Sequence, residues 1–278
     1  MTPGTLYVVA TPLGHLGDLT QRAADVLRTV PVVAAEDTRR TIGLLDHLGA
    51  RPRLLSFHAH SPERRTGALL EILQGGRDVA LVTDAGTPTL SDPGAALVAA
   101  VRDAGLAVVP IPGPSAVAAA LSGAGLPADR FLFLGFIPRK GRERRRLLAQ
   151  AVASEWTVVL YEAPPRLVAL LEDLAEAAGP GRRAVIAREL TKIHEEWRRG
   201  TVEELARHYT DHPPRGELTI VLEGASETPV GTGPEPDPAG RARELIAGGA
   251  TRKAAAALLV EELGLSRNAA YRIVTGLS

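Results

Sequence analysis

The chain has 278 residues, 45% of them hydrophobic, which is enough for one large or two ordinary globular domains. Its 32 lysine and arginine residues balance 32 aspartate and glutamate residues, so no overall charge draws it to nucleic acid or to a membrane, although local patches can still act. The lack of cysteine excludes disulfides, thiol catalysis and cysteine-ligated metal sites. The first residues contain neither a basic segment nor a long apolar run, so we expect no signal peptide, no membrane span and a cytoplasmic location.

The first half of the chain alternates short apolar runs with helical patterns, which predicts a mostly parallel α/β sheet. Strands are expected at 6–10, 32–35, 54–57, 79–83 and 107–111, with helices at 19–27, 66–73, 95–101 and 117–121. The loop after the first strand contains glycines but matches neither the dinucleotide fingerprint nor the P-loop, which gives little support to nucleotide phosphate binding.

The segment 79–94, VALVTDAGTPTLSDPG, runs from a buried strand into a long loop rich in glycine, proline and aspartate. Most strand-to-helix connections need only about 2–6 residues. An ordinary connection with good turn residues is the alternative interpretation. Because ligands bind at the carboxyl edge of parallel sheets, we interpret this loop as the centre of a binding site.

Three other strand ends carry candidate residues. The run 36–40, EDTRR, fits either a salt-bridged helix start or the edge of a site. Ser115 stands at an expected helix N-cap, where capping and ligand contact can coexist. His58 and His60 alternate after the third strand, but no third spaced ligand accompanies them, so a metal site is a weak hypothesis.

The second half predicts another α/β domain. Strands are expected at 131–137, 157–161, 183–187, 196–199 and 218–222, with helices at 147–153, 165–178 and 202–209. A proline- and glycine-rich linker should follow, and then three short helices at 238–247, 251–263 and 266–274 whose spacing resembles a helix-turn-helix. We therefore expect domains at 1–122 and 123–224, with 123–129 as their hinge, a flexible linker at 225–237 and a helical tail at 238–278.

Two charged segments lie in this half. The run 139–146, RKGRERRR, has six basic residues and one acid. A solvated loop or helix start would account for it, but clustered arginine is also typical of contact with a nucleic-acid backbone, which we favour. Glu189 and Lys192 follow a strand end in RELTK, where a structural ion pair is the default interpretation.

Seven segments in one order between residues 5 and 224 carry a resemblance: LYVVATPLGHLGDLT, AAEDTRRT, LVTDAGTPTLSDPG, PIPGPSAVAAALSGAGL, FLFLGFIPRKG, LYEAPPRL and ARELTKIHEE. Together they resemble the tetrapyrrole-methylase-type (class III) S-adenosylmethionine methyltransferases. The porphyrin and corrin methylases of this family usually have GDP in the corresponding loop. The segments are most similar to the branch that methylates the ribose 2′-OH of a cytidine in the decoding region of 16S ribosomal RNA. The chain departs from the pattern at Thr83, where serine is usual, and at 164–165, where the histidine of a frequent Ser-Pro-His is absent.

The resemblance implies two α/β domains of tetrapyrrole-methylase type with S-adenosylmethionine in the cleft between them, and commonly a homodimer. Carried over by position, the cofactor contacts are Leu13, Asp84, Gly86, Thr87, Leu90, Ser115, Ala116, Tyr161, Ala187 and Leu218. The catalytic candidates, chosen by charge and strand-end position, are Lys192, Glu189, Glu36 and Arg39, because a weakly acidic ribose hydroxyl needs a base or a nearby cation. Contacts with 16S rRNA or the small ribosomal subunit would fall to Arg139, Lys140, Arg142, Arg144, Arg145 and Arg146, assisted by the helical tail, and the reaction requires no metal.

Two other functions stay open at this point. A small-molecule methylase acting on a tetrapyrrole precursor would need an apolar cleft, and the aromatic share of 4% and the arginine-rich run argue mildly against it. A non-catalytic RNA-binding or ribosome-assembly protein would use the basic run and the helical tail, but it would not require the polar central loop.

Overall fold

The computed structural model describes residues 2–58, 63–225, 237–263 and 266–276. The chain divides into two compact units, Met1–Ala225 and Ser226–Ser278. His60 and nearly all of the predicted linker at 225–237 lie outside the described residues. Within the described ranges, none of the helices combines the length and apolarity that crossing a membrane would demand.

The first sheet has the strand order β3-β2-β4-β1-β5 and pairs its strands in parallel throughout, as the alternating sequence predicts. Its strands are β1 (Thr5–Val9), β2 (Val32–Ala35), β3 (Arg53–Ser56), β4 (Val79–Val82) and β5 (Ala107–Ile111). Every residue of β2 and β4 is buried, because helices cover both faces of the sheet, and this explains their uninterrupted apolar sequences.

Alternate residues of each strand face opposite layers of helices. Leu6 of β1 packs in one core with α3 (Glu63–Gln74) and α4 (Ala95–Asp103), whereas Val9 packs in another with α1 (Gln21–Thr29) and α2 (Thr38–Leu48). From the sequence, a helix start at EDTRR is one of two alternatives, and the structure shows that helix as α2. Its N-cap signal is present, since the Asp37 side chain accepts a hydrogen bond from the Arg39 N–H at 2.9 Å.

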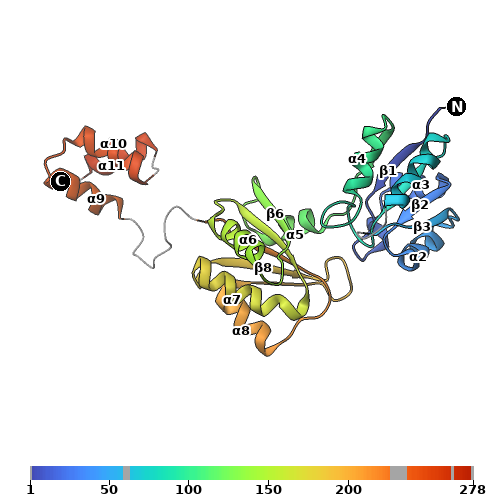
Figure 1. Cartoon of the computed structure of the whole chain (residues 1–278). Helices are drawn as coiled ribbons and strands as arrows, with labels where there is room; N and C mark the ends of the chain where they lie inside the picture. Colours follow the sequence, from blue (N-terminus) through green and yellow to red (C-terminus); the bar gives the residue numbers. More distant parts are fainter. Residues whose placement is uncertain (1, 59–62, 226–236, 264–265, 277–278) are drawn as a thin grey trace. The chain divides into compact units, whose positions relative to one another are not determined.

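The second sheet has the order β6-β7-β10-β8-β9 and is mixed. It consists of β6 (Phe131–Phe136), β7 (Thr157–Glu162), β8 (Arg183–Arg188), β9 (Glu196–Thr201) and β10 (Leu218–Leu222), of which only β6 and β7 pair in parallel among the described residues. Its larger core packs against α6 (Arg142–Ala153), α7 (Leu167–Ala178) and α8 (Val202–Asp211) (Figure 1).

The helix α5 (Ala116–Ala124) follows β5 of the first sheet but packs on the second. Its Val117 and Leu121 lie in one buried cluster with Val159 and Val221 of the second sheet. The predicted domain boundary between residues 122 and 123 therefore falls inside α5. This packing brings the loop before α5 to the junction of the two sheets.

The second unit has a small core of its own. It contains α9 (Pro238–Ala247), α10 (Arg252–Leu263) and α11 (Arg267–Thr275), whose shared core includes Ala242, Ala255, Leu259, Ala270 and Val274. The expected caps are formed. Thr251 accepts a hydrogen bond from the Ala254 N–H at 3.2 Å, and Ser266 accepts one from the Ala269 N–H at 3.3 Å.

Candidate functional site

A cavity of about 390 Å³ lies where the strand ends of the two sheets meet within the first unit. The first sheet contributes the loops after β1, β2, β4 and β5. The second contributes Phe136 at the end of β6, residues 161–164 at the end of β7 and residues 216–219 at the start of β10. Because β10 runs antiparallel to β7, with Leu218 opposite Glu162, its beginning lies at the same edge as the end of β7.

Backbone hydrogen bonds join the loops of the first sheet around this cavity. The N–H of Thr11 donates to the carbonyl of Gly86 at 2.9 Å, and the N–H of Gly86 donates to the carbonyl of Thr11 at 3.0 Å. The Thr87 hydroxyl donates to the carbonyl of Pro114 at 3.0 Å, which adds the loop after β5. Gly86 has φ of 83°, and a Cβ there would lie 3.2 Å from Leu13 Cδ2, so a side chain would be strained and crowded.

Apolar side chains form one part of the cavity wall. Phe136 is 52% exposed and Leu90 is 39% exposed, although both line a concave surface. The ring centroids of Phe136 and Tyr161 lie 5.5 Å apart. Exposed apolar groups in a concave site favour a ligand with a flat apolar part.

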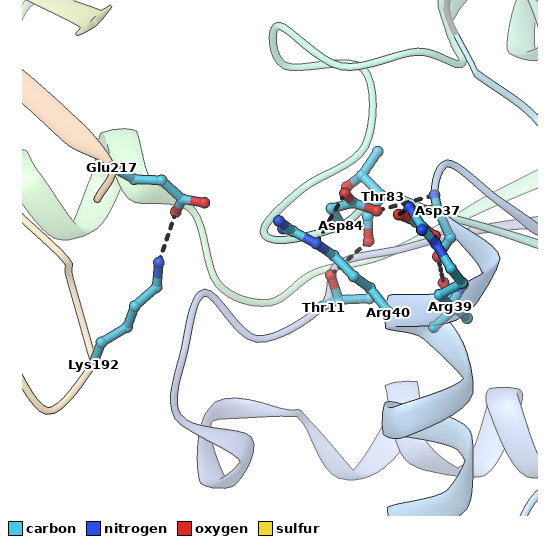
Figure 2. A network of polar contacts seen from close by, with 9 residues as sticks. Thr11, Asp37, Arg39, Arg40, Thr83, Asp84, Lys192 and Glu217 are labelled. Atoms are coloured by element: carbon cyan, nitrogen blue, oxygen red, sulfur yellow. Dashed lines mark hydrogen bonds and ion pairs between the residues drawn. The ribbon is translucent and has the colours of Figure 1, made fainter. Parts of the chain in front are cut away.

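Carboxylates dominate the polar part of the wall. Asp84 accepts a hydrogen bond from the backbone N–H of Asp37 at 3.0 Å and lies 3.5 Å from Arg40 Nε (Figure 2). Burial and the charges of Glu36 and Asp84 raise the pKa of Asp92 to about 7. Burial, followed by the charge of Asp84, also raises the pKa of Glu36. This excess of negative charge suits a ligand that carries a positive charge.

Lys192 lies at the rim beside two carboxylates, and Figure 2 shows its contact with one of them, Glu217. Its Nζ is 2.8 Å from Glu189 Oε1 and 3.1 Å from Oε2 of Glu217, a cavity residue. Burial alone would lower the pKa of Lys192, but hydrogen bonds and charges from Glu189 and Glu217 outweigh it and raise the pKa. Lys192 is therefore an ammonium group at neutral pH. A Cβ at Gly14 would lie 2.2 Å from Lys192 Cγ, so the loop after β1 and the lysine stem are in close contact.

Backbone strain concentrates in two segments near the cavity, the loop after β4 and the segment after β8. Among the described residues, the non-glycine positions with positive φ are Thr89, Ser91, Glu189 and Thr191. Such conformations cost free energy and cluster at binding and catalytic sites. The His15 N–H donates to the Thr191 hydroxyl at 3.1 Å, which joins the loop after β1 to the second of these segments.

The cavity gathers the predicted cofactor residues with one exception. Its wall includes Leu13, Asp84, Gly86, Thr87, Leu90, Ser115, Ala116, Tyr161 and Leu218. Ala187 is fully buried beneath α5 and is not part of the wall. Ser115 occupies the N-cap position of α5, but its side chain makes no capping hydrogen bond, contrary to the expected capping role.

The four catalytic candidates lie in different surroundings. Glu36 lines the cavity, and Glu189 and Lys192 reach its rim through Glu217. Arg39 pairs with Asp37 at 2.8 Å, has a side chain that is 88% exposed and does not line the cavity. Hydrogen bonds from Arg39 lower the pKa of Asp37 to about 2. Asp37 is the N-cap of α2, so this ion pair lies at the start of that helix.

The basic run is divided between a loop and the first turns of α6, which begins at Arg142. Arg144 is only 14% exposed, pairs with Asp173 of α7 and donates to the carbonyl of Pro138 at 3.0 Å. Arg146 pairs with Glu143 on the same helix. Arg139, Lys140, Arg142 and Arg145 are exposed.

Several cavity residues are absent from the predicted set, among them Arg40, Asp92, Phe136 and Glu217. Arg40 and Asp92 lie in two of the segments that carry the family resemblance, and Phe136 lies in a third, FLFLGFIPRKG. Glu217 precedes β10, and no sequence pattern shows that β10 is antiparallel to its neighbours. Within the described ranges, His, Cys, Asp and Glu side chains form no cluster of three or more that could hold a metal ion.

The sequence also matches a known family model. The model of the tetrapyrrole (corrin/porphyrin) methylases matches residues 5–206. The chain belongs to the tetrapyrrole methylase family. It is therefore a methyltransferase, and S-adenosylmethionine is the methyl donor of its family.

Curated relatives place this methyltransferase within the family more narrowly. It is 46% identical to a protein of Synechocystis over 97% of both chains, and 43% identical to one of Pseudomonas aeruginosa over 98% of this chain and 97% of the relative. A relative from Escherichia coli O157:H7 is 44% identical over 97% of this chain and 94% of its own length. All three are named ribosomal RNA small subunit methyltransferase I.

Several solved structures share the fold. The methyltransferase is similar to a uroporphyrin-III C-methyltransferase from Thermus thermophilus, with a TM-score of 0.57 and 25% identity over 78% of this chain and 94% of that one. A second structure of that kind, with a TM-score of 0.59 and 21% identity over 78% of this chain and 97% of the other, is complexed with S-adenosylhomocysteine. A diphthine synthase has a TM-score of 0.63 and 17% identity over 79% of this chain and 90% of its own.

Proposed function

We propose that this methyltransferase transfers a methyl group from S-adenosylmethionine to the ribose 2′-OH of a cytidine in the decoding region of 16S ribosomal RNA. The observation that carries the proposal is the cavity between the two sheets, which combines exposed apolar groups, an excess of carboxylates and the Lys192 ammonium at its rim. Relatives that are 43–46% identical over nearly the whole chain carry the name of a small-subunit ribosomal RNA methyltransferase.

The residues of the cavity fit the methyl donor. Leu13, Leu90 and Phe136 offer an apolar surface for an adenine ring. Glu36 and Asp92 provide negative charge for a sulfonium. The donor supplies a methyl group that is already activated on sulfur, so orientation of donor and acceptor accounts for much of the rate. The closely tied loops of Thr11, Gly86 and Thr87 give that orientation a rigid base.

The acceptor hydroxyl must lose a proton as its oxygen takes the methyl group. The Lys192 ammonium can stabilise the negative charge that develops on that oxygen. Glu36 and Asp92 have pKa values raised by burial, so either carboxylate is better able to accept a proton near neutral pH than an ordinary surface carboxylate. Arg39 would act indirectly, by holding Asp37 and hence the start of α2 next to Asp84.

The RNA backbone would contact Arg139, Lys140, Arg142 and Arg145, which are exposed and adjacent in sequence. Arg144 would instead hold α6 against α7 through Asp173. The cytoplasmic location and the homodimer expected from the sequence remain part of the proposal, and light scattering of the purified chain tests the dimer.

The test is methyl transfer from labelled S-adenosylmethionine to small ribosomal subunits from a strain that lacks this protein, with the modified nucleoside identified by mass spectrometry. A 2′-O-methylcytidine product supports the proposal. Donor binding without a labelled RNA product would favour a small-molecule methylase. If the donor does not bind at all, a non-catalytic RNA-binding role becomes the better account.

A further inference from the structure

A second cavity, of about 400 Å³, lies between α8 and the edge of the second sheet. Its wall includes Arg188 of β8, Arg198 of β9, Tyr209 of α8 and Arg215 of the segment that leads to β10. No residue of this cavity lines the first one. Consecutive residues nevertheless line the two cavities, because Arg215 lines the second and Gly216 and Glu217 line the first.

Positive charge exceeds negative charge in this wall. Glu196 is the carboxylate of the wall, and it is engaged by Arg188 Nε at 2.9 Å and by Arg198 Nε at 3.6 Å. Arg215 adds a third guanidinium. The arginines of the wall therefore outnumber its carboxylates by three to one.

Two buried polar atoms in the wall have unmet hydrogen-bonding capacity. Tyr209 is 2% exposed, and its hydroxyl has no hydrogen-bond partner within the described part of the chain. Among these residues Nε of Arg198 also lacks a partner with hydrogen-bond geometry, but it lies 3.6 Å from Glu196 Oε1, and Arg198 interacts with the Tyr209 hydroxyl. Buried polar groups are normally paired, and the Tyr209 hydroxyl keeps a hydrogen to donate. An anion in the cavity would accept from this hydroxyl and be attracted by the charge of Arg198.

Two histidines complete the wall next to the arginines. The rings of His208 and His212 stack with centroids 4.7 Å apart and an interplanar angle of 14°. Burial and the charges of Arg198 and His212 lower the pKa of His208, whereas Glu196 and Asp211 oppose that shift. An anion placed among these groups would favour protonation of His208 and so strengthen its own binding.

We propose that the second cavity binds a phosphate group of the RNA substrate, next to the nucleotide that receives the methyl group. This proposal rests on the proposed function, since it assigns the phosphate to RNA. Guanidinium groups bind phosphate through several parallel hydrogen bonds, and the unpartnered Tyr209 hydroxyl adds another donor. The segment 215–217 forms part of both walls, so a bound phosphate there would hold the RNA beside the methyl-transfer cavity.

The test compares three single variants in methyl transfer to small ribosomal subunits. Arg215→Gln removes an exposed charge from the wall, and Tyr209→Phe removes only the unpartnered hydroxyl. Arg207→Gln is the matched control, because Arg207 is an exposed arginine of α8 outside the wall. Either wall variant should raise the KM for RNA about tenfold while kcat and the KM for the donor stay unchanged. Arg215→Gln should also lower the slope of log K against log salt by about 1, and the control should match the unmodified protein.

A second measurement separates this proposal from the proposed function. Inorganic phosphate is titrated into the full chain while the ring signals of His208 and His212 are followed by NMR. Shifts at both rings that Tyr209→Phe weakens, together with the raised KM for RNA, support the proposal. Unchanged KM for RNA in both wall variants would overturn it, even if phosphate moves the histidine signals, because the anion would then not be RNA. If the unmodified protein methylates no RNA although the donor binds, the proposed function fails first and the assignment to RNA falls with it.

Discussion

The Nζ atom of Lys192 lies 3.1 Å from Oε2 of Glu217, and this pair joins the ELTK segment after β8 to the start of β10 (Figure 2). The same Nζ is 2.8 Å from Glu189 Oε1, so the two catalytic candidates of that segment neutralise each other in part. Because these carboxylates raise the pKa of Lys192 above its already basic ordinary value, the lysine is protonated at neutral pH and cannot serve as the base. Its role in the proposed reaction is that of a fixed positive charge.

Replacing Lys192 by methionine therefore tests the role of its charge. Lys192→Met keeps the length of the side chain and should lower kcat about a hundredfold, since a charge that stabilises a developing oxyanion is removed. The KM for the donor should change little. Single-turnover methyl transfer measures the effect, and thermal unfolding checks that the variant is folded. An unchanged kcat in a folded variant would show that the reaction does not need this ammonium.

The raised pKa of Asp92 makes stability depend on pH. The pKa is about 7 in the folded chain against an ordinary value of 3.8, so the folded state holds a proton that the unfolded state has released. Its favourable contribution is fully present below pH 3.8 and is lost as the pH rises through about 7. Asp92→Asn should thus have little effect near pH 4 and raise stability by about 1 kcal/mol at pH 8, after allowance for solvent screening of a partly exposed group. Urea unfolding at both pH values measures this, and an equal effect at both would contradict it.

The same carboxyl group should make donor binding depend on pH. Asp92 ionises as the pH rises through about 7, and a carboxylate attracts the sulfonium of S-adenosylmethionine but not the neutral sulfur of S-adenosylhomocysteine. The affinity ratio of donor to product should increase over this range by calorimetry. In Asp92→Asn the ratio should stay flat. A ratio that rises equally in both proteins would assign the effect to another group.

Local sequence patterns predict the strands and the parallel first sheet, and the rule that ligands bind at the carboxyl edge of such sheets predicts where the cavity lies. The family resemblance adds individual residues, and about half of the cavity wall is predicted in this way. The sequence cannot predict the placement of Glu217, which depends on the antiparallel insertion of β10 between β7 and β8. Nor does it distinguish Arg144 from its neighbours in RKGRERRR. The helical face and the partner Asp173 make that difference, and both are properties of the folded chain.

This distinction within the basic run can be measured. Arg144→Gln should lower the free energy of unfolding by about 1.5 kcal/mol or more, because it breaks charged hydrogen bonds to Asp173 and a bond to the Pro138 carbonyl. Arg145→Gln is the matched control for stability and should change it by less than about 0.5 kcal/mol. Arg145→Gln should instead weaken RNA binding and lower the slope of log K for RNA against log salt by about 1. Equal free energies of unfolding for the two variants would show that the contact between Arg144 and Asp173 contributes no net stability.

Removing the second unit tests the domain division. A chain that ends at residue 225 keeps both sheets and every residue of the donor cavity. We expect it to bind S-adenosylhomocysteine with unchanged affinity in calorimetry and to show a raised KM for RNA if the helical tail assists RNA binding. Loss of product binding in a folded truncated chain would mean that the second unit contributes to the donor site.

Gly86 should be essential at the point where the loops after β1 and β4 join. Gly86→Ala places a Cβ at φ of 83° and 3.2 Å from Leu13 Cδ2, which should cost roughly 1–2 kcal/mol of stability and weaken donor binding about tenfold or more. Gly43→Ala is the matched control, since Gly43 lies on α2 with open space around its Cβ position and alanine there should add up to about 1 kcal/mol of stability. Calorimetry with S-adenosylhomocysteine and urea unfolding measure both effects. Full affinity for S-adenosylhomocysteine in Gly86→Ala would contradict this prediction. It would show that the hydrogen bonds between Thr11 and Gly86 do not shape the donor site.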